Sequence, residues 1–224
     1  MAHDENKAFL RRVPLFSSLN ETQLEQLASG SVRKSYPRGR TIVAEGEPSQ
    51  SLYILLSGRA KVQRSDSEGK EVILAVISSG EFFGEMSLID DAPRSASVIT
   101  IESCDFMAIN KDSFKLMLTQ SPDIGMQIMK GLVRRLREAD KKIETLALLD
   151  VYGRVARVLL DFSETVGGER IVKNKLPRQE IAKMIGASRE MVSRVMKGLE
   201  IDGYIVPMGE GKLVLREKIS SYIS

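Results

Sequence analysis

The chain has 224 residues, of which 42% are hydrophobic and 28% charged, a composition typical of a globular protein with one large or two modest domains. It contains no run of about 18 uninterrupted apolar residues, and its first residues, MAHDENKAFLRR, lack the basic start and apolar stretch of a secretory signal. These features exclude a membrane span and predict a cytoplasmic protein.

Cysteine and histidine are scarce, because Cys104 and His3 are the single residues of their types. A single cysteine cannot form an intramolecular disulfide. The chain also lacks the ligands for a clustered zinc site, an iron–sulfur cluster or a histidine-bound haem. A Cys/His dyad or a Ser/His/Asp triad is equally implausible. We expect no metal, no haem and no enzyme activity, and we expect Cys104 to be a small buried residue.

Charge divides the chain into two unlike halves. Up to Gln127 there are 14 basic and 17 acidic residues, a net charge of −3, whereas the rest has 19 basic and 13 acidic residues, a net charge of +6. A basic half favours polyanions such as nucleic acid, and an ordinary solvated surface is the alternative.

Short β-branched runs alternate with glycine and proline turns from Val32 to Ile109, the pattern of a compact all-β domain. Before them, Asn20 precedes a segment that places Leu24 and Leu27 on one helical face. The sequence thus predicts a capped helix that packs against a β-domain.

A heptad pattern marks the helix predicted from about Ser121 to Leu149. Its apolar residues follow steps of three and four, as in a self-paired helix, although a helix packed on its own domain is the alternative. The predicted dimer interface consists of Met129, Leu132, Leu136, Ala139, Ile143 and Leu146.

A second unit follows Asp150 and has the pattern of a small winged-helix domain. It comprises an amphipathic helix from Val151 to about Glu164, a break at Gly167 and Gly168, two further helices, and a hairpin from Tyr204 to Leu215. The junction from Leu149 to Val151 is the predicted hinge.

The segment from Leu176 to Glu200 has the layout of a helix-turn-helix. Gly186 permits a tight turn and Ser188 can cap the second helix. That helix turns an apolar face inward and exposes a polar face suited to the major groove. The inward residues are Val192, Val195, Met196 and Leu199, and the exposed residues are Arg189, Glu190, Ser193, Arg194 and Lys197.

Three of the exposed side chains form a chemically sensible set for reading bases. Arginine can donate two hydrogen bonds to guanine, and glutamate can accept one from the cytosine amino group. Arg189, Glu190 and Arg194 therefore predict DNA binding, whereas the alternative is an ordinary amphipathic helical hairpin.

A second motif, GEFFGEMSLIDDAPRSASV from Gly80 to Val98, can hold a phosphate. Gly84 can bring backbone N–H groups close to an anion, and Arg94 can pair with it. Glu85 can accept a hydrogen bond from a ribose hydroxyl. Taken singly these residues are common, and a turn with a surface ion pair is the alternative.

Together the two motifs resemble the cyclic AMP receptor protein and fumarate–nitrate regulator family of bacterial transcription factors. The resemblance implies an α+β fold with an N-terminal, jelly-roll-like β-roll that binds a cyclic nucleotide, a long dimerisation helix and a C-terminal winged helix-turn-helix. The implied domains are a sensor over residues 1–120, the dimerisation helix and hinge over 121–149, and a DNA-binding domain over 150–224.

The resemblance also implies roles for individual residues. Ligand-binding positions are Leu74, Gly84, Glu85, Met86, Arg94, Ser95, Ala139 and Asp140, of which Gly84, Glu85, Arg94 and Ser95 would contact the ribose and cyclic phosphate. Arg189, Glu190 and Arg194 would read a GTGA-like half-site of an inverted repeat. DNA phosphates would be held by Arg178, Gln179 and Ser188, and the DNA-binding set includes Ser193 and Lys197.

The ligand is less constrained than the fold. Ala75, Ala139 and Asp140 replace hydroxyls expected beside adenine in this family, and a carboxylate at Asp140 can accept two donors from guanine. The expected effector is therefore cyclic AMP, cyclic GMP or cyclic di-GMP. For Asp140 the ordinary alternative is an exposed acid on the helix surface.

We expect ligand binding to shift a two-state equilibrium between conformations of different DNA affinity. RNA polymerase is the expected further partner. A constitutive DNA-binding regulator with an empty sensor pocket and a pure interaction scaffold are the alternatives.

Overall fold

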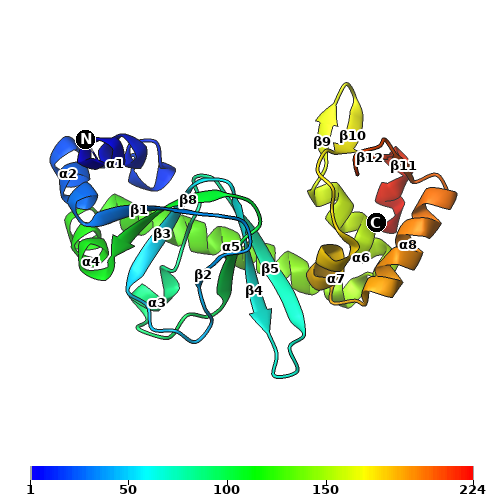
Figure 1. The fold of residues 1–224 in the computed structure, drawn as a ribbon, viewed down its shortest axis with the longest axis horizontal. Coiled ribbons are helices and arrows are strands. Elements are labelled where there is room, and N and C mark those ends of the chain that lie inside the picture. Colours follow the sequence, from blue (N-terminus) through cyan, green and yellow to red (C-terminus); the bar gives the residue numbers. More distant parts are fainter. Residues whose placement is uncertain (1, 224) are drawn as a thin grey trace. The chain divides into compact units, whose positions relative to one another are not determined.

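A computed structural model describes residues 2–223, and the side chains of residues 6–223. The chain forms two compact units, Met1–Arg135 and Leu136–Ser224, which we treat separately. Figure 1 shows the helices and strands of both units, coloured along the chain. Within the described residues, no helix combines the length and the apolar character needed to cross a membrane.

The first unit opens with short helices around a β-roll. The helical elements are α1 (Ala2–Leu10), the 3-10 turn η1 (Pro14–Phe16), α2 (Glu21–Ser29), α3 (Met86–Ile89) and α4 (Lys111–Gln120). Asn20 caps α2 as predicted, because its side chain accepts a hydrogen bond from the Gln23 backbone N–H and the Gln23 side chain accepts one in return. Leu24 and Leu27 are buried, so the predicted apolar face is confirmed.

Two four-stranded antiparallel sheets form the β-roll, in the orders β1-β8-β3-β6 and β2-β7-β4-β5. Their bounds are β1 (Ser31–Tyr36), β2 (Thr41–Val43), β3 (Ser51–Ser57), β4 (Arg59–Ser65), β5 (Glu71–Ser78), β6 (Phe82–Phe83), β7 (Ser97–Thr100) and β8 (Cys104–Asn110). Buried residues that alternate with half-buried ones on β3 and β7 fit the two-residue period of a strand. Cys104 is buried, as expected.

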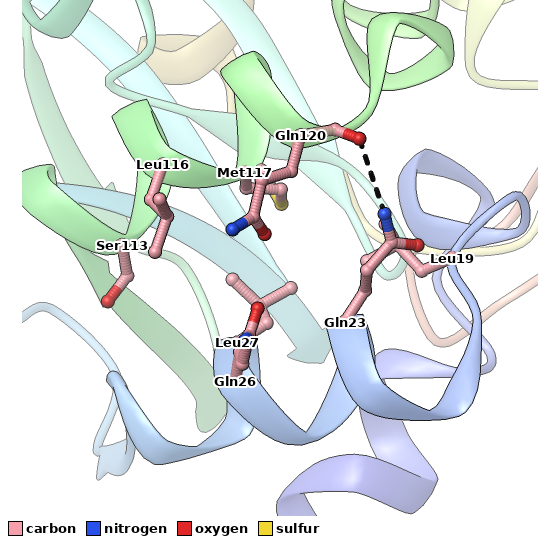
Figure 2. Close-up of a pocket in the computed structure, with 8 residues that line it drawn as sticks. All are labelled: Leu19, Gln23, Gln26, Leu27, Ser113, Leu116, Met117 and Gln120. Atoms are coloured by element: carbon pink, nitrogen blue, oxygen red, sulfur yellow. Dashed lines mark hydrogen bonds between the residues drawn. The ribbon is translucent and has the colours of Figure 1, made fainter.

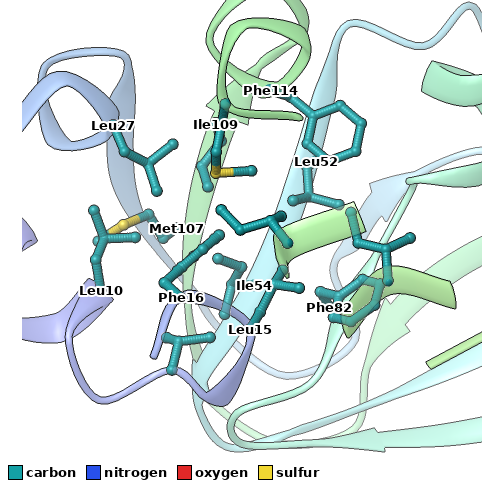
Figure 3. Packing of buried hydrophobic residues seen from close by; sticks show 14 of the residues in the cluster. Leu10, Leu15, Phe16, Leu27, Leu52, Ile54, Phe82, Met107, Ile109 and Phe114 are labelled. Atoms are coloured by element: carbon teal, nitrogen blue, oxygen red, sulfur yellow. The ribbon is translucent and has the colours of Figure 1, made fainter. Parts of the chain in front are cut away.

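The main core lies where α2 and α4 cover one sheet. Phe16, Leu52, Met107 and Phe114 are almost fully buried there and pack together with Phe82 from β6 (Figure 3). A second cluster, around Phe83 and Phe106, fills the interior between the sheets. Since Phe82 and Phe83 point into different clusters, the two-residue strand β6 anchors the segment that follows it.

The long helix α5 (Pro122–Leu148) has 27 residues and runs from the first unit into the second. Its first part belongs to the first unit, where Ile124 and Ile128 are buried and Leu132 packs against the main core. The expectation of a helix from about Ser121 to Leu149 is confirmed.

The second unit packs three helices against a four-stranded sheet of order β11-β12-β10-β9. Its elements are α6 (Val151–Asp161), β9 (Glu164–Val166), β10 (Glu169–Val172), α7 (Arg178–Ile185), α8 (Arg189–Ile201), β11 (Ile205–Pro207), β12 (Leu213–Leu215) and the 3-10 turn η2 (Glu217–Tyr222). Its core gathers residues of α6, α7 and α8, among them Val155, Ile181 and Leu199.

The predicted end of the first winged-helix element near Glu164 is wrong, because Glu164 begins strand β9. Gly167 and Gly168 both have positive φ, 59° and 85°, which is the backbone of a tight two-residue hairpin turn rather than of a helix end. Helices α1 and α4 and the turn η2 were also not expected from the sequence.

Replacement of Leu159 by alanine tests the core of the second unit. Leu159 is fully buried, so Leu159→Ala leaves a cavity and should lower the free energy of unfolding by about 2–5 kcal/mol. Urea denaturation followed by circular dichroism measures the change. The control is Ile201→Ala, whose side chain is 74% exposed and whose stability should stay within about 0.5 kcal/mol of the wild type. Equal losses in both variants would contradict this core.

Candidate functional site

The segment from Gly80 to Val98, here called the cassette, contains β6 and, directly after it, a glycine whose backbone is left-handed. Gly84 has φ of 88°, and a Cβ atom there would collide with the guanidinium of Arg94 and come within 3.1 Å of the Ser51 carbonyl oxygen. Both the backbone conformation and the space therefore require glycine. The consequence is that Arg94 can lie directly against the Gly84 backbone.

Arg94 is buried and is held by backbone carbonyls. Its Nη1 donates to the Gly84 oxygen at 3.0 Å and its Nη2 donates to the Ser51 oxygen at 2.7 Å. The side chain is 5% exposed, and burial lowers the pKa of its guanidinium while Tyr53 and Glu85 oppose that effect. Its Nε has no acceptor among the described residues. A buried charged donor without an acceptor is costly, and an anion would satisfy it.

Glu85 is more deeply buried than Arg94, at 1% exposure. Its Oε1 accepts a hydrogen bond from Nη1 of Arg135 at 2.5 Å, whereas its Oε2 has no donor among the described residues. Burial raises the pKa of the Glu85 carboxyl, and the positive charge of Arg135 partly offsets this. The free oxygen can accept a hydrogen bond from a hydroxyl.

Arg135 of α5 was missed as a site residue by the sequence analysis, which placed it among the charges flanking the heptad seam. It also donates to the Phe82 carbonyl oxygen and lies 5.1 Å from the centroid of the Phe82 ring. One turn earlier, a Cβ at Gly131 would be 2.9 Å from the same ring, so the glycine allows α5 to approach β6 closely. The sequence carried no local signal for this contact, because the partner Glu85 lies 50 residues earlier in the chain.

The other predicted ligand positions are more open. Leu74 on β5 and Met86 on α3 are partly exposed, and Ser95 is exposed beside Arg94. Ala139 and Asp140 belong to the second unit, where both are exposed on α5. The structure thus brings together Gly84, Glu85 and Arg94 in the first unit, whereas Ala139 and Asp140 belong to the second.

A shallow groove lies elsewhere in the first unit, between α2 and α4 (Figure 2). Gln23 and Gln120 meet at one end of it, where the Gln23 side-chain amide donates to the Gln120 carbonyl oxygen at 3.4 Å. The remaining lining residues are Leu19, Gln26, Leu27, Ser113, Leu116 and Met117. None of these residues is ionisable, so we do not place the chemistry of the site here.

The helix-turn-helix has the predicted geometry. Gly186 ends α7 with φ of 66°, and the Ser188 hydroxyl accepts a hydrogen bond from the Met191 N–H at the start of α8. All four residues expected to face inward are buried. The exposed positions are Gln179, Ser188, Arg189, Glu190, Ser193, Arg194 and Lys197, whereas Arg178 is half-buried.

Helix α8, called the reading helix below, carries both signs of charge at its start. The backbone N–H of Glu190 and the Ser188 side chain lower the pKa of the Glu190 carboxyl, so it is ionised at neutral pH. Arg189 and Arg194 lie on the same exposed surface. This surface offers bidentate donors and one acceptor to a partner.

The heptad residues of α5 divide between inside and outside. Met129, Leu136, Ile143 and Leu146 are each more than half exposed, and Ala139 is exposed as well. Leu132 is half-buried against the core of the first unit. An exposed apolar stripe along a long helix is unusual for a monomer and is available for pairing.

Among the described residues, no group of three or more His, Cys, Asp or Glu could hold a metal ion.

Family models match both units of the chain. A cyclic nucleotide-binding domain matches residues 33–121, and a Crp-like helix-turn-helix domain matches residues 153–218. The first match includes the cassette and the second includes the reading helix.

Curated relatives match almost the whole chain. The CRP-like cAMP-activated global transcriptional regulator of Mycobacterium tuberculosis is 34% identical over 210 residues, which cover 92% of this chain and 93% of that protein. The cyclic AMP receptor protein of Thermus thermophilus is 34% identical over 204 residues, which cover 91% and 93% of the two chains.

A solved structure shows the same architecture, and its sequence is also related. The c-di-GMP responsive global regulator CLP of Xanthomonas campestris has a TM-score of 0.76 and 30% identity, and the match covers 88% of this chain and 99% of that chain. The expected arrangement of N-terminal β-sheets, long helix and C-terminal helix-turn-helix is therefore confirmed. With its cassette, its helix-turn-helix and these relatives, the chain belongs to the cyclic AMP receptor protein and fumarate–nitrate regulator family of DNA-binding transcription regulators.

Proposed function

We propose that this chain is a homodimeric transcription regulator whose affinity for an inverted-repeat DNA site is controlled by a cyclic nucleotide. The observation that carries the proposal is the buried pair Arg94 and Glu85, each with one polar atom that lacks a hydrogen-bond partner among the described residues. The same chain presents Arg189 and Arg194 on an exposed reading helix. Sensor and reader therefore occur in one polypeptide.

The cassette fits a ribose cyclic phosphate. Arg94 supplies a positive charge and a free Nε–H donor for the phosphate, and Oε2 of Glu85 supplies an acceptor for a ribose hydroxyl. Ser95 adds an exposed hydroxyl next to Arg94. Since each unsatisfied buried group is costly, a ligand that satisfies both stabilises the bound state.

Two ligand classes follow from the relatives and from the sequence. Cyclic AMP is the first candidate, because the mycobacterial relative is named as cAMP-activated. A guanine nucleotide is the second candidate, because Asp140 can accept two hydrogen bonds from guanine and because the Xanthomonas relative is named as c-di-GMP responsive. Leu74, Met86 and Ala139 are the apolar residues proposed beside the base.

The DNA site is proposed to be a GTGA-like inverted repeat. Arg189 and Arg194 would read guanine and Glu190 would read cytosine in the major groove. The residues proposed to contact phosphates, or to lie beside them, are Arg178, Gln179, Ser188, Ser193 and Lys197. Two such half-sites, about one helical turn apart, suit a symmetric dimer.

The dimer is proposed to form through the exposed stripe of α5. Ligand binding at the cassette would change the contacts of Arg135, which links Glu85 to this helix. The ligand and DNA must then raise each other's affinity by the same factor. RNA polymerase is the proposed partner of the DNA-bound dimer, and equal DNA affinity with and without every nucleotide would indicate a constitutive regulator instead.

Replacement of Arg94 tests the sensor. Arg94→Gln removes the charge that we propose holds the phosphate, so affinity for the activating nucleotide should fall by about tenfold or more. Isothermal titration calorimetry with cyclic AMP, cyclic GMP and cyclic di-GMP, each in a separate experiment, measures this and identifies the ligand. Enhancement of DNA binding by cyclic AMP alone would exclude guanine reading by Asp140.

The matched control is Arg33→Gln on β1, which removes the same charge from a side chain paired with Asp105 at 2.9 Å. Its nucleotide affinity should equal that of the wild type. Wild-type affinity in Arg94→Gln would overturn the proposed phosphate contact.

Replacement of the reading arginines tests the DNA interface. Arg189→Ala or Arg194→Ala should cost about 1–3 kcal/mol of binding free energy and relax one position of the half-site. Fluorescence anisotropy on a GTGA inverted repeat, at fixed salt, measures both effects. Arg38→Ala, an exposed arginine of the first unit, is the control and should leave DNA affinity unchanged. Unchanged affinity and specificity in both reading variants would refute this interface.

Charged substitutions on α5 test the dimer. Leu136→Glu or Ile143→Glu places like charges opposite each other in a parallel helix pair, so the chain should become monomeric. Sedimentation equilibrium measures the mass. Leu116→Glu on α4, where Leu116 is half exposed, should remain dimeric. A dimeric mass for both α5 variants would show that the stripe is not the interface.

A further inference from the structure

The first turn of α6 contacts the C-terminus of α7 and the last part of the reading helix. This turn directly follows the two residues, Leu149 and Asp150, that separate it from α5. Its Arg154 reaches the turn before α8, and its Tyr152 reaches the last part of α8. The sequence assigned no DNA-binding role to either side chain, and neither belongs to the sites described above.

Arg154 joins two backbone carbonyls that lie far apart in the sequence. Its Nη1 donates to the Ile185 oxygen at 3.0 Å, and its Nε donates to the Asp150 oxygen at 3.4 Å. Ile185 is the last residue of α7, so its carbonyl has no acceptor role within that helix. A guanidinium at a helix C-terminus is also favoured by the helix dipole. Arg154 thus connects the helix-turn-helix turn to the residue that caps α6.

Tyr152 contacts the last part of the reading helix. A Cβ at Gly198 would lie 2.8 Å from the Tyr152 hydroxyl, so the glycine is what allows the two helices to approach. The Tyr152 ring stacks on Tyr222 with centroids 5.7 Å apart, and Tyr222 meets Tyr204 edge-on at 5.1 Å. A tyrosine from η2 therefore fixes Tyr152 in place.

The residue that precedes this turn is itself fixed to it. The Asp150 side chain accepts a hydrogen bond from the Gly153 N–H at 2.9 Å. A Cβ at Gly153 would be 2.6 Å from the Tyr222 carbonyl oxygen and 3.1 Å from Cβ of Leu149. The junction, the first turn of α6 and η2 are thus packed without space for a larger residue.

We propose that Arg154 and Tyr152 are positioning residues that make the reading helix follow the backbone of the junction. With the C-terminus of α7 and the last part of α8 both held by one helical turn, a change at Leu149 and Asp150 moves the turn and the reading helix together. The proposal rests on the proposed DNA-binding function, because it concerns how the reading surface is aimed.

Two variants test the two contacts separately. Arg154→Lys keeps the charge, but a single ammonium group does not reproduce the fork that reaches both carbonyls. Gly198→Ala adds a methyl group against Tyr152 and at the same time increases helix propensity. A variant that favours the helix yet aims it wrongly separates positioning from stability.

The readout is the ratio of affinities for a GTGA inverted repeat and for a scrambled duplex at the same salt, with and without cyclic AMP, cyclic GMP or cyclic di-GMP. A loss of folded protein lowers both affinities equally and leaves this ratio unchanged. Mispositioning lowers the specific affinity alone, because non-specific binding depends on phosphate contacts. We expect the ratio to fall by about tenfold in each variant, and the enhancement by the activating nucleotide to fall with it.

The matched control is Arg157→Lys, one turn further along α6, where Arg157 lies 3.5 Å from Asp161. Its ratio should equal that of the wild type. A wild-type ratio in either Arg154→Lys or Gly198→Ala overturns the proposal that the first turn of α6 positions the reading helix through both contacts. A wild-type chain that shows no preference for the inverted repeat with any nucleotide overturns the proposed function itself, and this is seen before any variant is made.

Discussion

A buried carboxylate requires a cation or hydrogen-bond donors beside it. Glu85 is 1% exposed, and the cation beside it is Arg135 of the long helix α5. The same guanidinium lies over the Phe82 ring, whose other contacts are in the main core. Gly131 leaves room for the ring one turn earlier. The ion pair thus joins α5 to the β-roll beside the apolar contacts that Ile124 and Ile128 make with the main core.

This arrangement links the cassette to the helix energetically. Glu85 has one oxygen bonded to Arg135 and one oxygen free, so a group that binds the free oxygen also changes the charge that Arg135 senses. Arg94 is held separately by backbone oxygens and pairs with no carboxylate of the described residues. The two buried ions thus have different roles, since Glu85 is tied to the helix and Arg94 is tied to β3 and to the Gly84 backbone.

Features that depend on neighbouring residues were predictable from the sequence. The Asn20 and Ser188 caps, the left-handed Gly186 and the inward face of α8 all follow from spacing within one turn of helix. Arg135 was not predictable in the same way, because its partner Glu85 is 50 residues earlier and an arginine on a charged helix is usually solvated. The β9–β10 hairpin was missed because its two glycines were taken as a simple break.

The heptad seam illustrates why a regular pattern can serve two purposes. Leu132 packs against the core of the first unit, whereas Leu136 and Ile143 stay exposed on the same helix. The sequence pattern is the same for both, since core packing and helix pairing both require an apolar residue every three or four positions. Burial within the chain distinguishes the two uses, and the pattern alone does not.

Because α5 is one uninterrupted helix, its length determines a rotation as well as a distance. Each residue of an α-helix turns the chain by about 100° and advances it by about 1.5 Å. The residues between Leu136 and Leu148 therefore set an angular phase between the exposed stripe and the start of α6, as well as a distance. One inserted residue would rotate everything beyond it by about 100° relative to the stripe, while three or four would leave it about 60° or about 40° from the original phase. The number of residues in α5 therefore determines the direction in which α6 begins relative to the exposed stripe.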